Sequence, residues 1–488
     1  MDERYLLGVD VGTTALKVIL FARNGEIVKG AVREYELSTP SPHHVECDPE
    51  TYWESLRSCI QEVLKDVALE DVVALAISSQ GETLVPVDRE GSPLRNAIVW
   101  LDDRAGDEAE EIGRAFPPEQ IYRTTGQPEV LPNWPACKIL WLKKKEPSVF
   151  RSAHKFLLLE DYLILRLTGR AVGDYSLYTS SLMLDIVRKG WWEEMLKLIG
   201  ISQDRLPELA ESGTYVGSVA NEEVGLSPRT AVVTGGMDQV CGMVGVGNIA
   251  PGIVSETTGG ALAICATTGK PIFDPLRRIP CHYHALRDTY FLLPWCQTGG
   301  MALKWLRDNF DYPSYDEMTA EAGKVPPGSE GLIVLPHLAG AGSPDFNPRA
   351  RGVFFGVALS TTKAHFVRAT MEAIGYMLKQ NVEVLEGLGV KVERVYSMGG
   401  GSRSPLWNQI KADITEKPII TVQNEETACL GAAILAGLGV GAFSSLEEAC
   451  RKMNKEKARY LPRQENVRTY REAYRKYLEI SEALLPLF

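Results

Sequence analysis

Three observations in the sequence predict an α/β protein of two domains. The chain has 488 residues, which is more than a single hydrophobic core usually organises. Its first 80 residues have the pattern strand, strand, strand, helix, strand. A similar hairpin of apolar strands around glycine and hydroxyl residues returns near residue 255. We therefore expect two related halves, with domains over 1–247 and 248–488.

The first hairpin contains a carboxylate beside a glycine turn. Residues 5–11 form an apolar run around Asp10 and predict a buried strand. Gly12, Thr13 and Thr14 predict a tight turn before a second strand over 16–21. A second turn at residues 24–25, an Asn-Gly pair, leads into a third strand over 26–35. The three strands predict a meander at the start of the domain.

Residues 10–17 suit phosphate binding. Gly12 lets the backbone approach a phosphate closely, and the amides and hydroxyls of Thr13 and Thr14 can donate hydrogen bonds to its oxygens. Lys17 adds a positive charge, and Asp10 suits coordination of Mg²⁺ through water. The alternative interpretation is that the glycine serves only to turn the chain.

A helix and a strand complete the pattern. Asp48 predicts an N-cap, with Pro49 at the first helical position and an apolar stripe at helical spacing as far as residue 67. Residues 72–77 then form a β-branched buried strand. The order β-β-β-α-β is typical of a ribonuclease H-like, actin-like ATPase domain. We expect two such domains to flank a catalytic cleft.

The second hairpin repeats the phosphate pattern. The segment 252–256 leads into Thr257, Thr258 and Gly259, and another apolar strand follows over 261–266. A duplicated hairpin would place two such turns face to face, each holding one end of a triphosphate. Thr257, Thr258 and Gly259 are therefore predicted to bind ATP together with the first turn.

A third glycine-rich segment is predicted to flank the adenosine of the nucleotide. It follows a strand over 394–397 and precedes a helix over 405–415, and Gly400, Gly401 and Ser404 are its candidate ligands. A strand, a glycine turn and a helix present backbone groups to a nucleotide in α/β folds. The segment has neither the lysine of a P-loop nor the spacing of a dinucleotide fingerprint.

Composition narrows the class of protein. The net charge of −11 argues against a nucleic-acid or anionic-membrane surface, because such surfaces need a positive field. We find no signal-peptide pattern and no apolar run near the ~20 residues of a membrane helix, so we expect a cytoplasmic protein. Nine scattered cysteines without a C-x-x-C pair predict buried thiols.

Two further motifs resemble the FGGY carbohydrate kinases, a family that includes glycerol kinases, xylulokinases and ribulokinases. The more specific motif is Gly-Val-Phe-Phe-Gly-Val at 352–357, followed by His365-Phe366 and Ala-Thr-Met-Glu at 369–372. The amino-domain motif is recognisable at 135–142, although Asn133 departs from its usual residue. The resemblance covers nearly the whole chain. It implies an ATP-dependent kinase for a small sugar or polyol that uses Mg²⁺, and homodimers are common in the family.

The resemblance identifies Asp238 as the general base. It lies in Gly-Gly-Met-Asp-Gln at 235–239, which corresponds to the catalytic segment of the family. A carboxylate within hydrogen-bond reach can accept the proton of a hydroxyl that attacks the γ-phosphorus. The alternative interpretation is that Asp238 only caps the apolar helix that follows.

The resemblance also places the acceptor site after two strands. Glu82 can accept hydrogen bonds from vicinal hydroxyls, and Trp100 suits an apolar wall against the carbon skeleton. We expect the substrate to be contacted by Gln80, Gly81, Glu82, Trp100, Asp102, Arg104, Asp238 and Gln239.

Three interpretations of the function remain open. Glu82 and Thr83 resemble glycerol kinases, but Gly81 replaces their arginine and leaves room for a longer sugar. The segment 345–352 follows the sugar-kinase form, which favours a ketose or polyol of four to six carbons and a xylulokinase-like pentulose kinase. A sensor that binds nucleotide and sugar without catalysis is the alternative from another class.

Overall fold

A computed structural model of the protein describes residues 4–488, which fold as two compact units. The first segment of the first unit ends at Ile249, and residues 280–291 and 426–455 fold with it. The second unit comprises residues 250–279, 292–425 and 456–488. The predicted boundary at 247/248 lies close to the point where the chain first leaves the first unit. It does not describe the two later segments, 280–291 and 426–455, which fold with that unit again.

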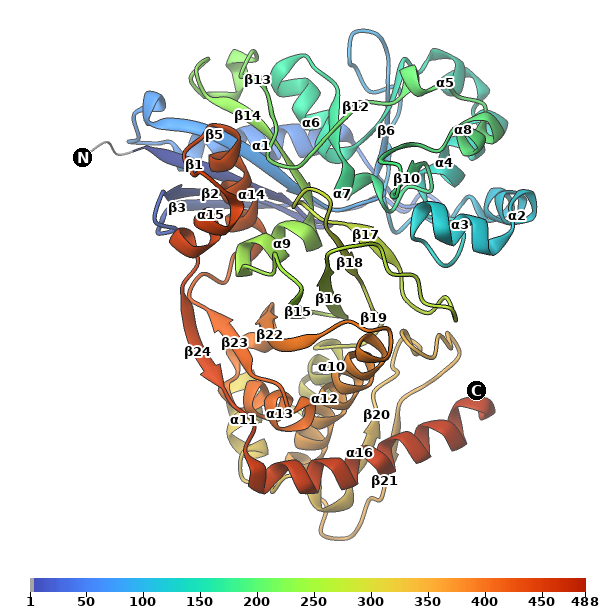
Figure 1. Ribbon diagram of the computed structural model, residues 1–488, viewed down its shortest axis with the longest axis vertical. Helices are drawn as coiled ribbons and strands as arrows, with labels where there is room; N and C mark the ends of the chain where they lie inside the picture. Colours follow the sequence, from blue (N-terminus) through green and yellow to red (C-terminus); the bar gives the residue numbers. More distant parts are fainter. Residues whose placement is uncertain (1–3) are drawn as a thin grey trace. The chain divides into compact units, whose positions relative to one another are not determined.

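The first unit is built on a six-stranded sheet in the order β13-β14-β5-β1-β2-β3 (Figure 1). β1 (Tyr5–Val11), β2 (Ala15–Ala22) and β3 (Ile27–Glu34) form the expected antiparallel meander. β5 (Val72–Ser79) lies parallel to β1, and β14 (Ala231–Met237) lies parallel to β5. β13 (Tyr215–Ser218) forms the antiparallel edge. This topology confirms the predicted ribonuclease H-like domain.

Helices pack against the strands of this sheet. α1 (Pro49–Val63) contacts β2 and β3, and the Asp48 side chain accepts from the N–H of Glu50 as the expected N-cap. α14 (Thr427–Gly439) and α9 (Asp238–Val246) pack together, and α14 lies on β1, β5 and β14. A Cβ at Gly8 of β1 would stand 1.8 Å from the carbonyl oxygen of Cys429. This close approach explains why residues 426–455 fold with the first unit, since α14 covers the sheet there.

A smaller sheet of the first unit has the order β4-β7-β6-β8. Its strands are β4 (Glu46–Cys47), β6 (Leu84–Val87), β7 (Ala97–Ile98) and β8 (Lys155–Leu158). The other helices of this unit are α2 (Gly106–Ala115), α3 (Pro118–Thr125), α4 (Pro135–Lys145), α5 (Pro147–Ser152), α6 (Leu159–Thr168), α7 (Tyr175–Tyr178), α8 (Glu193–Ile199) and α15 (Leu446–Met453). Its other strands are β9 (Val172–Asp174), β10 (Leu184–Asp185), β11 (Gly190–Trp191), β12 (Glu208–Ala210) and β17 (Cys281–Tyr283).

The second unit repeats the same arrangement. β15 (Gly252–Thr258) and β16 (Leu262–Thr268) form an antiparallel hairpin, and β22 (Val392–Met398) lies parallel to β15. β23 (Ile419–Val422) follows in parallel, and β24 (Glu456–Tyr460) is antiparallel to β23. The order β16-β15-β22-β23 matches β2-β1-β5-β14 of the first unit. The shared order confirms the two related halves.

Long helices pack in the second unit. α12 (Lys363–Gly387) contacts α13 (Pro405–Thr415), and the bounds of α13 agree with the predicted helix. α16 (Gln464–Leu484) buries a stripe of tyrosines, among them Tyr474 and Tyr477, against Tyr376 of α12. Other elements of this unit are α10 (Met301–Asn309), α11 (Tyr315–Ala322), β19 (Trp295–Cys296), β20 (Ile333–Leu335) and β21 (Val353–Phe355). β18 (Tyr290–Leu292) contains the boundary at 291/292 between two of the chain segments.

All nine cysteines are buried free thiols, as predicted. Among residues 4–488, every helix is too short or too polar to cross a membrane.

Candidate active site

Three carboxyl groups gather at one edge of the first sheet. Asp10 lies in β1, Glu82 follows β5, and Asp238 begins α9 directly after β14. β1, β5 and β14 are parallel neighbours, so their carboxyl ends meet at this edge. The charges of Asp10 and Glu82 both act on Asp238. The sheet thus brings together residues from three separately predicted segments.

The environment of Asp238 suits proton transfer. Burial and then the negative charge of Asp10 raise the pKa of Asp238 to about 7, whereas the Gln239 N–H, 2.6 Å from Oδ1, acts in the opposite direction. Burial also raises the pKa of Asp10, and the Ser78 hydroxyl, which donates to Oδ1 at 2.8 Å, opposes this rise. A carboxyl group whose pKa lies near neutrality is poised to accept a proton from a hydroxyl.

The first turn has the expected hairpin geometry. The Gly12 N–H donates to the carbonyl of Ala15 at 2.9 Å, and Thr14 is exposed at the tip. The indole Nε1 of Trp100 donates to Thr13 Oγ1 at 2.9 Å. Trp100 therefore contacts the predicted phosphate turn directly, a connection that the sequence did not reveal.

Lys17 makes an ion pair within the first unit. Its Nζ lies 2.6 Å from Glu426 Oε2, and both side chains are 35% exposed. Glu426 belongs to the late segment that folds with the first unit, immediately before α14. The ammonium of Lys17 is thus held at the end of β1 by a residue that lies far away in the sequence.

The loop after β5 has an unusual backbone. Glu82 has a φ of 57°, a conformation that non-glycine residues seldom adopt. Burial raises the pKa of its carboxyl group, while a hydrogen bond with the Ser180 side chain and the charge of Lys138 lower it. Gln80 is 3% exposed, and its Oε1 has no hydrogen-bond partner among the described residues. The loop therefore presents one carboxylate and one unpaired amide oxygen.

The space beside Gly81 is narrower than we expected. A Cβ at this position would stand 3.1 Å from Ser180 Oγ and 3.8 Å from Met237 Sδ. Ser180 thus fills the volume that the missing side chain was expected to leave for a longer sugar. No local pattern in the sequence pointed to Ser180, because it precedes β10 in a segment far from the loop.

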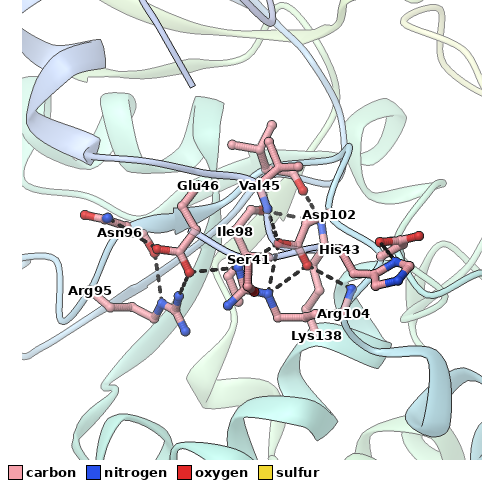
Figure 2. Close-up of polar contacts among 12 residues, drawn as sticks. Ser41, His43, Val45, Glu46, Arg95, Asn96, Ile98, Asp102, Arg104 and Lys138 are labelled. Carbon is pink, nitrogen blue, oxygen red and sulfur yellow. Dashed lines mark hydrogen bonds and ion pairs between the residues drawn. The ribbon is translucent and has the colours of Figure 1, made fainter. Parts of the chain in front are cut away.

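Asp102 and Arg104 form a buried network (Figure 2). Asp102 is 0% exposed, and the Arg104 side chain is 1% exposed. Arg104 Nε donates to both carboxylate oxygens of Asp102, at 2.8 and 2.9 Å, and its NH2 group donates to Glu46 Oε1 at 2.7 Å. The guanidinium also lies over the ring of Trp141, 4.9 Å from its centroid. Every polar group named here is thus engaged inside the protein.

The buried carboxyl group of Glu160 holds β14, the strand that leads to Asp238. Glu160 in α6 is 0% exposed, and its Oε1 accepts the Gly235 N–H of β14 at 2.7 Å. Ser176 Oγ accepts the Met237 N–H at 3.1 Å and itself donates to Asp174 at 2.5 Å. These contacts fix the backbone immediately before Asp238.

Glu160 and Asp174 are two buried carboxyl groups, and burial raises the pKa of both. Asp174 Oδ1 accepts hydrogen bonds from the Ser176 backbone, the Ser176 hydroxyl and the Ser212 hydroxyl, which suits a carboxylate. Burial and then the charge of Asp174 raise the pKa of Glu160 well above its ordinary value. The three hydrogen bonds to Asp174 and the larger rise at Glu160 favour the proton on Glu160. Both residues were missed in the sequence, where each looked like an ordinary polar residue of a helix or strand.

In the second unit, Thr258 is already committed to internal contacts. Thr258 is 1% exposed, and its hydroxyl donates to Glu256 Oε2 at 2.6 Å. The buried Lys411 ammonium lies 2.6 Å from Glu256 Oε1 and 3.0 Å from Thr258 Oγ1. Thr257 is half-buried and Gly259 is exposed. The predicted phosphate turn is therefore accessible at the backbone of Gly259. The Thr258 hydroxyl, which we expected to bind phosphate, is buried and bonded within the protein.

The third glycine segment lies directly on the end of β15. Gly399 has a φ of 72°, and a Cβ at Gly401 would stand 2.6 Å from Thr258 Cβ. Ser404 caps α13, because its hydroxyl accepts the Trp407 N–H at 3.2 Å. Gly400 is exposed beside this cap. The structure therefore brings the second and third predicted nucleotide segments together within one unit.

The repeated ribonuclease H-like topology, with carboxyl groups at the strand ends of the first unit, defines an actin-like ATPase fold. The sequence matches the FGGY family of carbohydrate kinases twice, with the N-terminal domain over residues 5–245 and the C-terminal domain over 253–440. The chain belongs to this family. It is a phosphotransferase that acts on a sugar or polyol hydroxyl, and family membership implies ATP as the donor.

Relatives with different acceptors are similar to this chain. The xylulose kinase of Bacillus subtilis is 31% identical over 98% of this chain and 96% of its own length, and the gluconokinase of the same organism has the same identity and coverage. The glycerol kinase of Thermococcus gammatolerans is 33% identical over 91% of both chains. The ligand-bound crystal structure of xylulose kinase from Lactobacillus acidophilus superposes with a TM-score of 0.91, covering 99% of this chain and 98% of that one at 28% identity.

Proposed function

We propose that this kinase phosphorylates a hydroxyl of a small uncharged ketose or polyol, with a pentulose such as xylulose as the favoured acceptor. The observation that carries the proposal is the group of Asp238, Glu82 and Gln80 at one sheet edge, beside the first phosphate turn. The similarity to xylulose kinases supports the pentulose, because it extends over nearly the full length of both chains.

Asp238 acts as the general base. It accepts the proton of the attacking hydroxyl. Its raised pKa lies near neutral pH, where a general base is most effective. Glu160 and Ser176 hold the backbone of β14 on which this carboxylate stands. General-base catalysis of this kind contributes about 10²–10⁴-fold to the rate.

Glu82 and Gln80 bind the other hydroxyls of the acceptor. The unpaired Oε1 of Gln80 is buried, and a buried acceptor without a donor favours a ligand hydroxyl in that place. Trp100 supplies an apolar face, with Gly81 and Gln239 beside the reacting groups. We assign Asp102 and Arg104 a supporting role in this site, because their polar atoms are engaged within the protein.

The donor side uses backbone groups. In the first unit, Gly12, Thr13, Thr14 and Lys17 are assigned to phosphate binding. In the second unit, Thr257, Gly259 and the backbone of Thr258 are assigned to phosphate binding as well. Gly400, Gly401 and Ser404 flank the adenosine. Gly259 and Gly400 lie in two separate turns of the second unit, and both are exposed. This exposure supports their assignments. Domain closure over ATP stays a prediction.

Asp10 of the first unit is our candidate ligand for Mg²⁺. Asp10, Glu82 and Asp238 bring carboxyl oxygens to one sheet edge, and Mg²⁺ prefers oxygen ligands while keeping part of its water. Asp10 would hold the ion through water. A bound ion would neutralise charge on the phosphates during transfer.

An uncharged acceptor fits the site better than an acid such as gluconate. Asp10, Glu82 and Asp238 are acidic groups, and each repels an anion in its ionised form. The buried cations of this region, Lys138 and Arg104, direct their N–H groups at carbonyls and carboxylates of the chain. A gluconate carboxylate would therefore bind without a free cation from these two residues.

The test is ADP release with Mg-ATP across a panel of acceptors. Xylulose, ribulose, xylitol, erythritol, glycerol, rhamnulose, fuculose and gluconate are each compared with a blank that lacks an acceptor. A ketose or polyol should give the highest kcat/KM, and preference for glycerol would select the glycerol kinase alternative. Preference for gluconate would contradict the argument from charge, and sugar binding without ADP release would support the sensor. A homodimer and a cytoplasmic location stay predictions.

A further inference from the structure

Lys138 is a fully buried lysine in the middle of α4. Its side chain lies within the 135–142 motif and is 0% exposed. Lysine is almost never fully buried unless its ammonium is paired. A buried ammonium loses its hydration, so its N–H groups need fixed acceptors within the protein.

The acceptors of this ammonium are backbone carbonyls. Nζ donates to the carbonyl oxygens of Glu82 at 2.8 Å, Val99 at 2.9 Å and Ile98 at 3.4 Å. Lys138 and Ile98 are labelled in Figure 2. An ammonium has three N–H groups and no acceptor of its own, so three carbonyls match its full capacity. A neutral amine has one donor fewer and would leave one carbonyl unpaired.

These carbonyls belong to two separate segments of the acceptor site. Glu82 lies in the loop after β5, where its backbone has a φ of 57°. Ile98 ends β7, and Val99 directly precedes Trp100. The positive φ costs on the order of 1 kcal/mol or more and persists only where the surroundings impose it. The Lys138 ammonium donates to the carbonyl of Glu82, the residue with the positive φ.

We propose that Lys138 is the positioning residue of the acceptor site, because one buried ammonium joins the backbone that presents Glu82 to the backbone that presents Trp100. This inference rests on the proposed function in one respect, since it assumes that Glu82 and Trp100 contact the acceptor. Lys138 itself contacts neither the acceptor nor the phosphate. It sets the separation between the carboxylate that binds hydroxyls and the ring that packs against the carbon skeleton, and so it governs acceptor binding more than ATP binding.

Two neighbouring carboxyl groups favour the protonated form of Lys138, and burial opposes it. Burial lowers the pKa of Lys138 to about 7, and the negative charges of Glu82 and Asp102 oppose that change. Arg104 and Cys137 also face the ammonium, and Arg104 disfavours its charge. Asp102 thus has a second role beside its hydrogen bonds to Arg104, which is to stabilise the protonated form of Lys138.

The test is the variant Lys138→Met, which keeps the length of the side chain and removes its donors. The KM for the best acceptor should rise about 10- to 100-fold, the effect of leaving buried carbonyls unpaired, while the KM for ATP changes less than about threefold. Lys155→Met is the matched control, because Lys155 Nζ donates to the carbonyls of Asp204 and Leu206, both at 2.7 Å, in another part of the same unit. This control should leave both KM values unchanged.

Amide hydrogen exchange tests the same inference without any acceptor. In Lys138→Met, residues 80–84 and 97–101 should exchange at least about tenfold faster than in the wild type, whereas Lys155→Met should not change them. Equal changes in both KM values, or unchanged exchange in these two segments, would overturn the proposal. If no compound in the panel is phosphorylated by the wild type, the proposed acceptor class fails, and hydrogen exchange still decides the role of Lys138.

A second variant covers the case in which Lys138→Met does not fold. Lys138→Arg keeps the positive charge beside Glu82 and Asp102, but a planar guanidinium cannot direct three N–H groups from one nitrogen to three carbonyls. It should fold, raise the acceptor KM by about three- to tenfold, and leave the ATP KM unchanged. Wild-type acceptor binding in Lys138→Arg, with wild-type exchange at residues 80–84, would contradict the positioning role.

Discussion

The indole Nε1 of Trp100 donates a hydrogen bond to Thr13 Oγ1 at 2.9 Å. This bond joins the ring expected against the acceptor to the turn expected at the phosphate. The Trp100 N–H also donates to Thr83 Oγ1, at 3.3 Å, next to Glu82. The acceptor segments and the phosphate turn of the first unit are therefore parts of one hydrogen-bonded structure.

Replacing Trp100 by Phe should impair donor and acceptor use together. Phe keeps an apolar ring but removes the indole donor, so Thr13 loses a partner worth about 0.5–1.5 kcal/mol. We expect kcat/KM for both substrates to fall about three- to tenfold, measured by steady-state ADP release. Trp134→Phe is the control, because its indole donates to the Glu129 carbonyl at 3.1 Å outside these segments. An effect of Trp100→Phe on the acceptor KM alone would contradict the link to the phosphate turn.

Replacing Asp238 by Asn should remove the base while preserving the fold. We expect kcat to fall about 10²–10⁴-fold, with ATP affinity by calorimetry changed less than about threefold. Because burial raises the pKa of Asp238, the ionised form is disfavoured in the folded state, and neutral Asn should leave the melting temperature at pH 8 unchanged or higher. Near-wild-type kcat in a correctly folded Asp238→Asn protein would exclude the base role.

The rate should depend on pH through Asp238. Its folded-state pKa is raised from 3.8 to about 7, so the carboxyl group is mostly protonated below pH 6 and cannot accept the hydroxyl proton. The kcat/KM for the acceptor, which reports the free enzyme, should fall with an acid limb near pH 7. A profile measured from pH 5.5 to 8.5 checks this. A flat profile, or a limb near pH 4, would show that the carboxylate is ionised throughout.

Glu160 and Asp174 should respond differently to amide substitution. Glu160→Gln keeps an acceptor for the Gly235 N–H and a donor toward Asp174, so stability should change by less than about 1 kcal/mol. Asp174→Asn weakens three hydrogen bonds to a charged acceptor and should cost about 2–3 kcal/mol, with a lower kcat because β14 loosens. Urea unfolding and kcat measure both variants. The reverse order of effects would place the proton on Asp174.

Several local features were predictable because their signals lie close together in the sequence. Asp48 and Pro49 predicted the start of α1, since capping depends on a few adjacent residues. The predicted helix over 405–415 has the bounds of α13, but its cap by Ser404 was seen only in the structure. The meander of β1, β2 and β3 followed from apolar runs and glycine turns. The fold class predicted from these local signals was confirmed by the observed sheet topology.

Other features depended on packing between distant segments. Ser180 fills the space beside Gly81, and Thr258 turns its hydroxyl toward Lys411 instead of solvent. Neither contact has a local signal, because the partners are separated by about a hundred residues or more in the sequence. Predictions for these positions were therefore limited to residue type and place in a motif.

By itself, the sequence determined the family, the repeated α/β topology and the segments that carry the chemistry, because strand periodicity, turn residues and caps act over short distances. The tertiary structure decided which polar groups face the site and which are engaged within the protein. Arg104 is buried against Asp102, and Lys138 donates to the carbonyl of Glu82. The physical reason is that a buried charge must find its partners among residues that only folding brings within hydrogen-bond distance.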